Sequence, residues 1–195
     1  SFRYPFIETL CSILFVLCIF ASPSSIGLTN EVVLLVAGWL LSSFLISLSF
    51  IDLDYLWLPS CLTKSAILSG IVCTLCSSLF SLNTYNHVFI INNICASIIG
   101  FLSFRFFSFL IKKIIKKQGL GNGDANLAAL AGSFLGLTGL EISVVISILI
   151  AGLFSIICLT KGILKRGAYI PFGPFMSISI LSVWLLGNDF WLRRL

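Results

Sequence analysis

Aspartate residues in two stretches of this sequence are the best candidates for catalytic groups. Asp52 and Asp54 lie in the stretch Phe50–Pro59, and Asp124 ends the glycine-rich stretch Gly119–Asp124 and opens directly onto an apolar run. A carboxylate at the mouth of an apolar segment is costly to ionise unless neighbouring groups stabilise it. Such a residue is therefore a functional hypothesis in its own right.

A pair of these carboxylates could activate a water molecule. Two carboxylates held close together cannot both ionise cheaply, so they share one proton. The ionised member can then act as a base on a water, while the protonated member polarises a peptide carbonyl. Positions two apart on a helix point about 200° apart, so only one of Asp52 and Asp54 can face a common site with Asp124. In the alternative reading, each aspartate is a separate helix-end cap or ion-pair partner.

The composition defines the elements that must position these carboxylates. Hydrophobic residues make up 58% of the chain and charged residues 10%, and the mean hydropathy is +1.12. Because a soluble domain carries roughly 25% charged residues, this composition indicates an integral membrane protein. No period-two alternation extends over a barrel-length series, so we predict an all-α, polytopic helix bundle.

Apolar segments near membrane-spanning length can be drawn along the whole chain, which we treat as one domain, residues 1–195. The seven predicted segments are approximately 5–22, 32–51, 62–80, 88–110, 125–139, 141–160 and 172–187.

Basic residues between these segments predict the orientation of the chain. Lysine or arginine occurs at the N-terminus and in or beside the loops near 52–62, 111–124 and 161–171, and the intervening loops have none. The positive-inside rule makes the basic loops cytoplasmic, which puts Asp52 and Asp124 on the same side of the membrane. Arg193 and Arg194 are the exception, because seven crossings place the C-terminus outside.

The net charge of +5 does not indicate a nucleic-acid partner, because the basic residues lie between apolar runs and not along one face. They indicate topology and contacts with anionic membrane lipid. The seven cysteines are an odd number and mostly lie in apolar runs, so we interpret them as small core residues. Cys73 and Cys76 have metal or redox spacing, but no other ligand clusters with them, and His87 is the only histidine. We predict no metal site.

Four motifs in the sequence resemble those of one protease family. Phe50–Pro59 and Gly119–Asp124 resemble the two signature motifs of the type IV prepilin peptidases, which are polytopic aspartic proteases of the GxGD type. Arg3–Glu8 resembles the segment that follows the family's cytoplasmic domain, and Ile170–Phe175 resembles its motif at the start of the last helix. The four motifs stand in family order and cover essentially the whole chain.

The resemblance implies that Asp52 and Asp124 are the catalytic pair. Members of the family remove the short basic leader of prepilins or pseudopilins, after a glycine, on the cytoplasmic side of the bacterial inner membrane. They serve type IV pili or type II secretion, and proteolysis needs no metal, cofactor or covalent intermediate. Seven further residues are expected to shape the site or bind substrate, although a proline-defined helix start could be the whole role of the last four: Gly119, Gly121, Gly123, Pro171, Phe172, Gly173 and Pro174.

The sequence departs from the family pattern in three places. Ser60 stands where the family often has an aspartate, and Asn126 stands where a lysine is common. We expect these changes to tune the site. The family's first membrane segment and its cytoplasmic Cys-x-x-Cys domain do not precede the motifs here, so we expect a part of a longer chain or a trimmed one. S-adenosylmethionine, the methyl donor of bifunctional members, is expected only if a longer parent chain also methylates.

Three other functions compete with this interpretation. The chain could be a different GxGD protease, such as a preflagellin peptidase or a presenilin-like intramembrane protease. It could be a small transporter or channel that uses intramembrane aspartates as proton or cation sites. It could also be an inactive remnant of the family, although the intact pair of Asp52 and Asp124 argues against this.

Overall fold

The chain folds as a bundle of helices. The structure, a computed structural model, describes residues 3–21, 28–80, 86–115, 121–162 and 171–193. The helices are α1 (Arg3–Ala21), α2 (Leu28–Tyr55), α3 (Ser60–Phe80), α4 (Asn86–Ile115), α5 (Asn122–Thr160), α6 (Gly173–Leu186) and α7 (Asn188–Leu192). The described residues contain no strand, and the predicted all-α helix bundle is confirmed.

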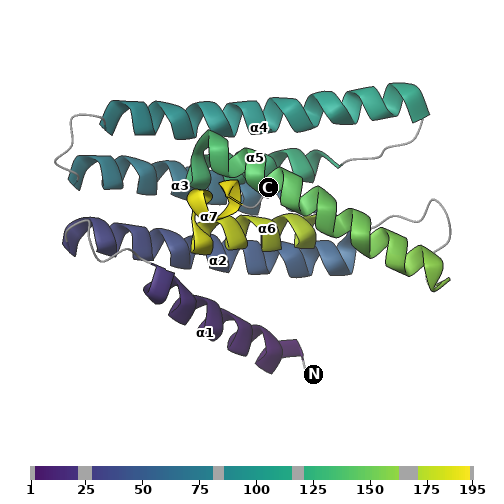
Figure 1. Ribbon diagram of the computed structural model, residues 1–195, viewed down its shortest axis with the longest axis horizontal. Helices are drawn as coiled ribbons and strands as arrows, with labels where there is room; N and C mark the ends of the chain where they lie inside the picture. The colour runs from purple at the N-terminus through teal and green to yellow at the C-terminus, as the bar shows by residue number, and fades with distance from the viewer. Residues whose placement is uncertain (1–2, 22–27, 81–85, 116–120, 163–170, 194–195) are drawn as a thin grey trace.

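Successive helices run back and forth along the long axis of the molecule (Figure 1). Helices α1 to α4 alternate in direction, and α5 passes along the axis twice because it bends sharply at Gly136. Helix α6 then runs along the axis once more, and the short α7 follows at its end. The end of α2 and the start of α5 therefore lie at the same end of the bundle.

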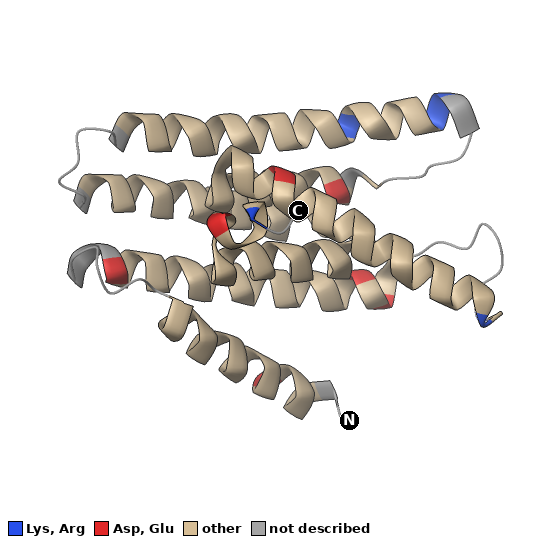
Figure 2. Ribbon diagram, in the orientation of Figure 1, with Lys and Arg blue, Asp and Glu red and all other residues tan. Residues whose placement is uncertain are grey.

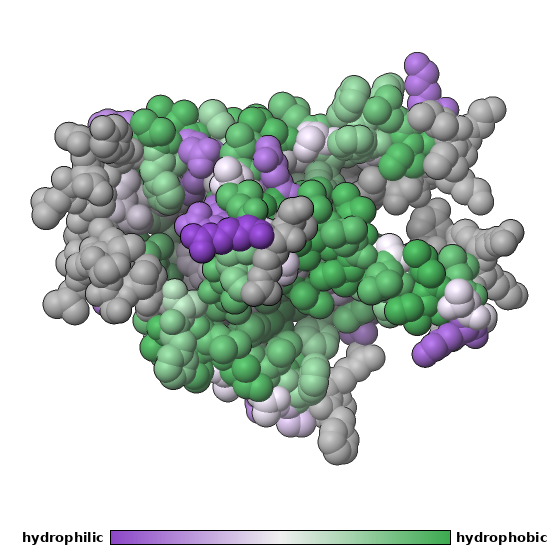
Figure 3. All heavy atoms as spheres, viewed as in Figure 1, coloured by the Kyte–Doolittle hydropathy of each residue, from purple (hydrophilic) through white to green (hydrophobic). Residues whose placement is uncertain are grey.

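The helices have the length and composition of membrane spans. Among the described residues, five stretches are long and apolar enough to cross a membrane, and α6 is a shorter apolar helix. The five are Tyr4–Ala21, Glu31–Tyr55, Ser60–Leu79, His87–Lys113 and Gly123–Thr160. Apolar side chains cover most of the visible face of the molecule (Figure 3), with charged residues mainly toward the helix ends (Figure 2). The chain is a multi-pass membrane protein.

The bend in α5 differs in position from the break expected between residues 139 and 141. It falls at Gly136, whose backbone angles are φ 72° and ψ −172°, a conformation that is essentially restricted to glycine. A Cβ atom at this position would lie 2.5 Å from Asn92 Nδ2. Gly136 therefore both reverses the direction of the chain and leaves room for α4. The segments predicted as 125–139 and 141–160 are the two arms of α5 on either side of this bend.

Helices α4 and α5 approach each other through small residues. A Cβ atom on Gly132 would lie 2.5 Å from the carbonyl carbon of Ala96, and one on Gly100 would lie 2.8 Å from the oxygen of Ala128. Such close backbone contact is the usual means of association between apolar helices, because lipid competes for larger apolar side chains. The first arm of α5 is consequently the centre of the bundle, with Leu127 and other side chains fully buried.

Side chains from α3 and α4 supply hydrogen bonds beside the bend. The Asn93 amide donates to the carbonyl oxygen of Ser133 at 3.3 Å, and the Thr74 hydroxyl is shared between the carbonyl oxygens of Gly70, at 2.9 Å, and Ser133, at 3.2 Å. Asn93 Nδ2 also donates to Thr74 Oγ1 at 3.1 Å. Polar backbone inside an apolar bundle needs such partners because no bulk water reaches it. The network fixes the bend against both neighbouring helices.

Replacing Gly136 with alanine should destabilise the protein strongly. The new Cβ would collide with Asn92 and would force an L-residue into a conformation that costs about 1–3 kcal/mol. Gly152→Ala is the matched control, because this glycine lies in the same helix with nothing within 4 Å of the added Cβ. Thermal unfolding in detergent should show a clear drop in Tm for Gly136→Ala and none for Gly152→Ala. Equal melting temperatures would contradict the role of the bend.

Candidate active site

Asp52 is buried at the last turn of α2. Its side chain is 6% exposed, and its Oδ2 accepts a hydrogen bond of 2.9 Å from the backbone N–H of Gly173, the first residue of α6. The start of a helix favours a negative charge because its backbone N–H groups lack partners within the helix. A Cβ on Gly173 would lie 2.6 Å from the same carboxylate oxygen. Only glycine lets α6 approach Asp52 this closely.

Asp54, two residues further along α2, has an exposed side chain. This agrees with the helix geometry, which allows only one of the two aspartates to face the bundle. Asp52 is the one that does so.

Asp124 is buried in the first turn of α5. Its side chain is 8% exposed, and its Oδ2 accepts a hydrogen bond of 3.0 Å from the backbone N–H of Gly121. The backbone N–H of Asp124 donates in return to the Gly121 carbonyl, at 3.2 Å. This reciprocal pairing is a helix-start arrangement that uses a carboxylate to satisfy free backbone donors. Asp124 thus stabilises the start of α5 and is oriented by it.

The end of α2 and the start of α5, which carry the two carboxylates, lie at the same end of the bundle (Figure 1). The charge of Asp52 acts electrostatically on Asp124, although 72 positions separate them in the sequence. Two buried carboxylates in this arrangement can hold one proton between them.

The connection between α2 and α3 closes one side of this site. Leu56, the residue that follows α2, has a left-handed φ of 51°, and its N–H donates to the Asp52 carbonyl at 2.9 Å. Leu58 is buried and packs against Gly123, where a Cβ would lie 2.7 Å from Leu58 Cβ. Position 123 therefore has no room for a side chain, because Leu58 occupies the space beside it.

The other expected site-shaping residues lie around the start of α6. Pro171, Phe172 and Pro174 are half-buried, and Pro174 stands in the first turn, where its missing N–H is no loss. Phe172 packs against Phe104 of α4 with the ring centroids 6.3 Å apart. Gly119 lies outside the described residues.

Sequence reasoning missed three contributors to this region: Leu58, Phe104 and Thr63, whose hydroxyl accepts a hydrogen bond from Asn126 near the start of α5. Leu58 stands inside the first motif, so its position could have been noticed. Phe104 and Thr63 carry no sequence signal, because their roles depend on contacts between distant helices.

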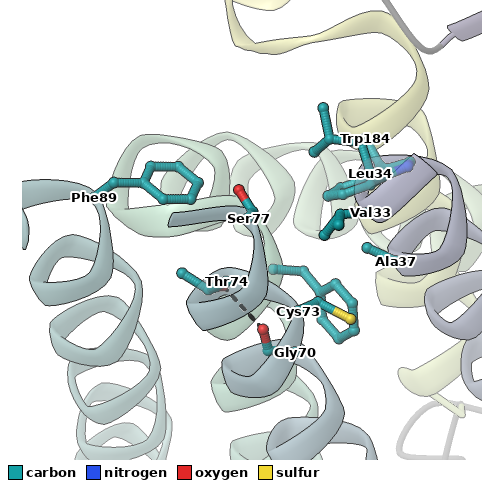
Figure 4. Close-up of a pocket in the computed structure, with 10 residues that line it drawn as sticks. Val33, Leu34, Ala37, Gly70, Cys73, Thr74, Ser77, Phe89 and Trp184 are labelled. Atoms are coloured by element: carbon teal, nitrogen blue, oxygen red, sulfur yellow. Dashed lines mark hydrogen bonds between the residues drawn. The ribbon is translucent and has the colours of Figure 1, made fainter. Parts of the chain in front are cut away.

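The cavity drawn in Figure 4 is separate from the two carboxylates. Its wall on α2 consists of Val33, Leu34 and Ala37. Ala37 stands 15 residues before Asp52 in the same helix, a distance of about 22 Å at 1.5 Å per residue. No residue that lines this cavity is charged.

The cysteines form no disulfide and no metal cluster. All seven are free, and the described part of the chain holds no group of three or more histidine, cysteine or acidic residues that could bind a metal ion. Cys18 and Cys158 are buried, as expected of core residues, whereas Cys61 and Cys95 are exposed. The expectation of core cysteines is therefore wrong for these two, which lie on outward helix faces.

The fold and site together define a multi-pass membrane protein with two buried carboxylates at one end of the bundle. Residues 39–156, which include both Asp52 and Asp124, match the type IV leader peptidase family. The chain belongs to this family.

Similar proteins from three bacteria extend the match beyond those residues. The prepilin leader peptidase/N-methyltransferase of Legionella pneumophila is 34% identical over 97% of this chain and 61% of its own length. The protein of the same description from Neisseria gonorrhoeae is 29% identical over 98% of this chain and 60% of its own length. The type 4 prepilin-like proteins leader peptide-processing enzyme of Escherichia coli O78:H11 is 27% identical, over 95% and 62%.

The chain thus spans only about three fifths of the length of these relatives, between 60% and 62%. No solved structure matches the chain.

The two glycines that donate to the carboxylates should respond differently to alanine. A Cβ at Gly173 would displace Asp52 or α6, at a cost of about 1–3 kcal/mol for overpacking. Gly121 is the matched control, because it also donates to a carboxylate but its added Cβ would lie 3.7 Å from Asp124 Oδ2. Thermal unfolding should therefore show a lower Tm for Gly173→Ala and little change for Gly121→Ala. The packing of α6 on Asp52 would be disproved by a Gly173→Ala variant as stable as the parent.

Proposed function

We propose that this chain is a membrane aspartic endopeptidase that removes the basic leader of type IV prepilins or pseudopilins. The observation that carries the proposal is the pair of buried carboxylates, one from α2 and one from α5, each of which accepts a hydrogen bond from a glycine backbone N–H. The backbone donors hold the two side chains in place without adding a competing charged group. Asp52 and Asp124 are the proposed catalytic residues.

Membership of the type IV leader peptidase family supports the substrate class. The relatives described above are named for prepilin leader peptidase activity or for processing the leader of prepilin-like proteins. Those names describe proteins longer than this chain, and the match covers the part that carries the two aspartates.

In the proposed mechanism the pair shares one proton before the substrate binds. The ionised carboxylate takes a proton from a water, whose oxygen attacks the scissile carbonyl carbon, and the protonated partner gives its proton to the carbonyl oxygen. The tetrahedral intermediate then collapses. The C–N bond breaks, the leaving nitrogen takes the proton held by the base, and the second carboxyl recovers its proton from the intermediate. The products are a leader with a free carboxylate and a mature protein with a free amine.

The distribution of charge supports a site that faces the cytoplasm of a bacterial inner membrane. Described lysines lie at the start of α3 and at the ends of α4 and α5, which are at the same end of the bundle as the aspartates: Lys64, Lys112, Lys113 and Lys161. The cytoplasmic side of a membrane protein is the side that retains such residues. Arg193, after α7, remains the exception among the described residues.

The depth of the aspartates favours a peptidase over an ion transporter. Asp52 lies three residues before the end of α2, and Asp124 is the third residue of α5. Carboxylates near a helix end can meet a substrate at the membrane surface, whereas an ion-transport pathway needs acidic groups near the middle of the membrane.

The proposal uses no cofactor for proteolysis. S-adenosylmethionine would be needed only if a longer parent chain also methylated the new N-terminus. The cavity in Figure 4 does not suit this molecule, because apolar side chains line most of it and none of its lining residues is charged. We assign no methylation step to the residues described.

Replacing either catalytic aspartate with asparagine should abolish leader cleavage. Asparagine keeps the shape of the side chain but can neither take nor give the proton, which should lower the rate by at least about 100-fold. The measurement is leader removal from a prepilin co-expressed in a host that lacks its own peptidase. Asp54→Asn is the matched control, because this residue is exposed beside the site, and it should retain cleavage.

An active Asp124→Asn variant, present in the membrane at the parent's level, would disprove the pair. A parallel panel of substrates separates the proposal from other GxGD proteases. Cleavage of prepilins with basic leaders, with no cleavage of ordinary transmembrane stubs, is the expected pattern. The opposite preference would favour a presenilin-like protease.

A further inference from the structure

A side-chain hydrogen bond joins the start of α5 to the start of α3 near the two carboxylates. Asn126 Nδ2 donates to Thr63 Oγ1 at 3.3 Å. Asn126 is two residues beyond Asp124, so it points to the side of α5 opposite the carboxylate. The same turn of α5 therefore carries Asp124 on one side and an attachment to α3 on the other.

Thr63 is itself held firmly in the first turn of α3. Its side chain is fully buried, its hydroxyl donates to the Ser60 carbonyl at 3.1 Å, and its backbone N–H donates to the Pro59 carbonyl at 3.1 Å. Pro59 ends the short connection from α2, the helix that carries Asp52. Hydrogen bonds therefore connect Asn126 to Thr63, and Thr63 to Pro59 in the segment that follows α2.

A second contact between the same elements is purely apolar. Leu58, in the connection between α2 and α3, packs against Gly123 at the start of α5. Apolar contacts of this kind permit rotation and sliding, whereas a hydrogen bond weakens steeply when its angle is lost. Of these two contacts, the bond between Asn126 and Thr63 is therefore the one that depends on the orientation of the first turn of α5.

We propose that Asn126 is a positioning residue for the cleavage reaction, acting through Thr63 to hold Asp124 at a fixed orientation toward Asp52. This inference rests on the proposed function. Catalysis by a shared pair depends on the placement of both carboxylates relative to the water, and a displacement of about 1 Å can lower a rate by about 100-fold. Asn126 touches neither the substrate nor the water in this role.

The chain offers a matched control at another place in the bundle. Asn188 Nδ2 donates to Thr138 Oγ1 at 3.0 Å, so the same two residue types make the same kind of bond. Thr138 lies beyond the bend in α5, and Asn188 begins α7. Loss of this bond should leave the two carboxylates undisturbed.

The test compares Thr63→Val, Asn126→Ala, Thr63→Ser and Thr138→Val in the full chain, with purified protein and a prepilin substrate. We expect Thr63→Val and Asn126→Ala each to lower kcat by about 10- to 100-fold with KM unchanged. Thr63→Ser keeps the hydroxyl and should retain kcat, and Thr138→Val should retain it as well. The double variant of Thr63→Val with Asn126→Ala should lose no more than either single variant, because both remove one bond.

A second readout does not depend on activity. Hydrogen–deuterium exchange should become faster in the second turn of α5, where the helical hydrogen bonds begin, for Thr63→Val and Asn126→Ala, and should stay at the parent's rate there for Thr138→Val. Unchanged kcat and unchanged exchange in Thr63→Val would overturn the positioning role, as would an equal loss of kcat in Thr138→Val. If the parent cleaves no prepilin while exchange still depends on Thr63 and Asn126, the proposed function fails and the positioning of Asp124 stands.

Discussion

A carboxylate inside an apolar bundle needs hydrogen-bond donors, and this requirement governs how the helices around the site are arranged. Asp52 and Asp124 are each satisfied by a backbone N–H of glycine at the start of a helix. At Gly173 an added Cβ would lie 2.6 Å from the carboxylate oxygen of Asp52, which is closer than van der Waals contact allows. The start of α6 therefore lies where it does because a glycine allows its backbone to reach Asp52.

The same requirement for close backbone approach explains the middle of the bundle. The first arm of α5 lies against α4 through Gly100 and Gly132, where even one added carbon would meet the neighbouring backbone. The bend at Gly136 returns the chain toward the end that holds the carboxylates. Small residues thus permit the first arm of α5 to lie at the centre of the bundle, and the polar side chains of Thr74 and Asn93 satisfy the backbone beside the bend.

The site joins elements that are far apart in the chain but share one end of the bundle. Helix α2 supplies one carboxylate, α5 supplies the other, and α6 supplies a donor. Leu58 and Thr63 connect the first two elements through apolar packing and a hydrogen bond, respectively. These contacts fix the positions of the helix ends relative to one another. A reaction that transfers protons between the two carboxylates and the substrate requires such a defined geometry.

The sequence by itself determined the class of the protein and much of its topology. The scarcity of charged residues required a membrane bundle, apolar runs marked the helices, and helical spacing allowed only one of Asp52 and Asp54 to face inward. The tertiary structure decided the rest. The bend falls at Gly136 and not near residue 140, because the choice between glycines depends on Asn92 of another helix. The donor to Asp52 comes from Gly173, 121 positions away, and the partner of Asn126 is Thr63, 63 positions away. Local patterns cannot specify such pairs, because they exist only when distant helices pack together.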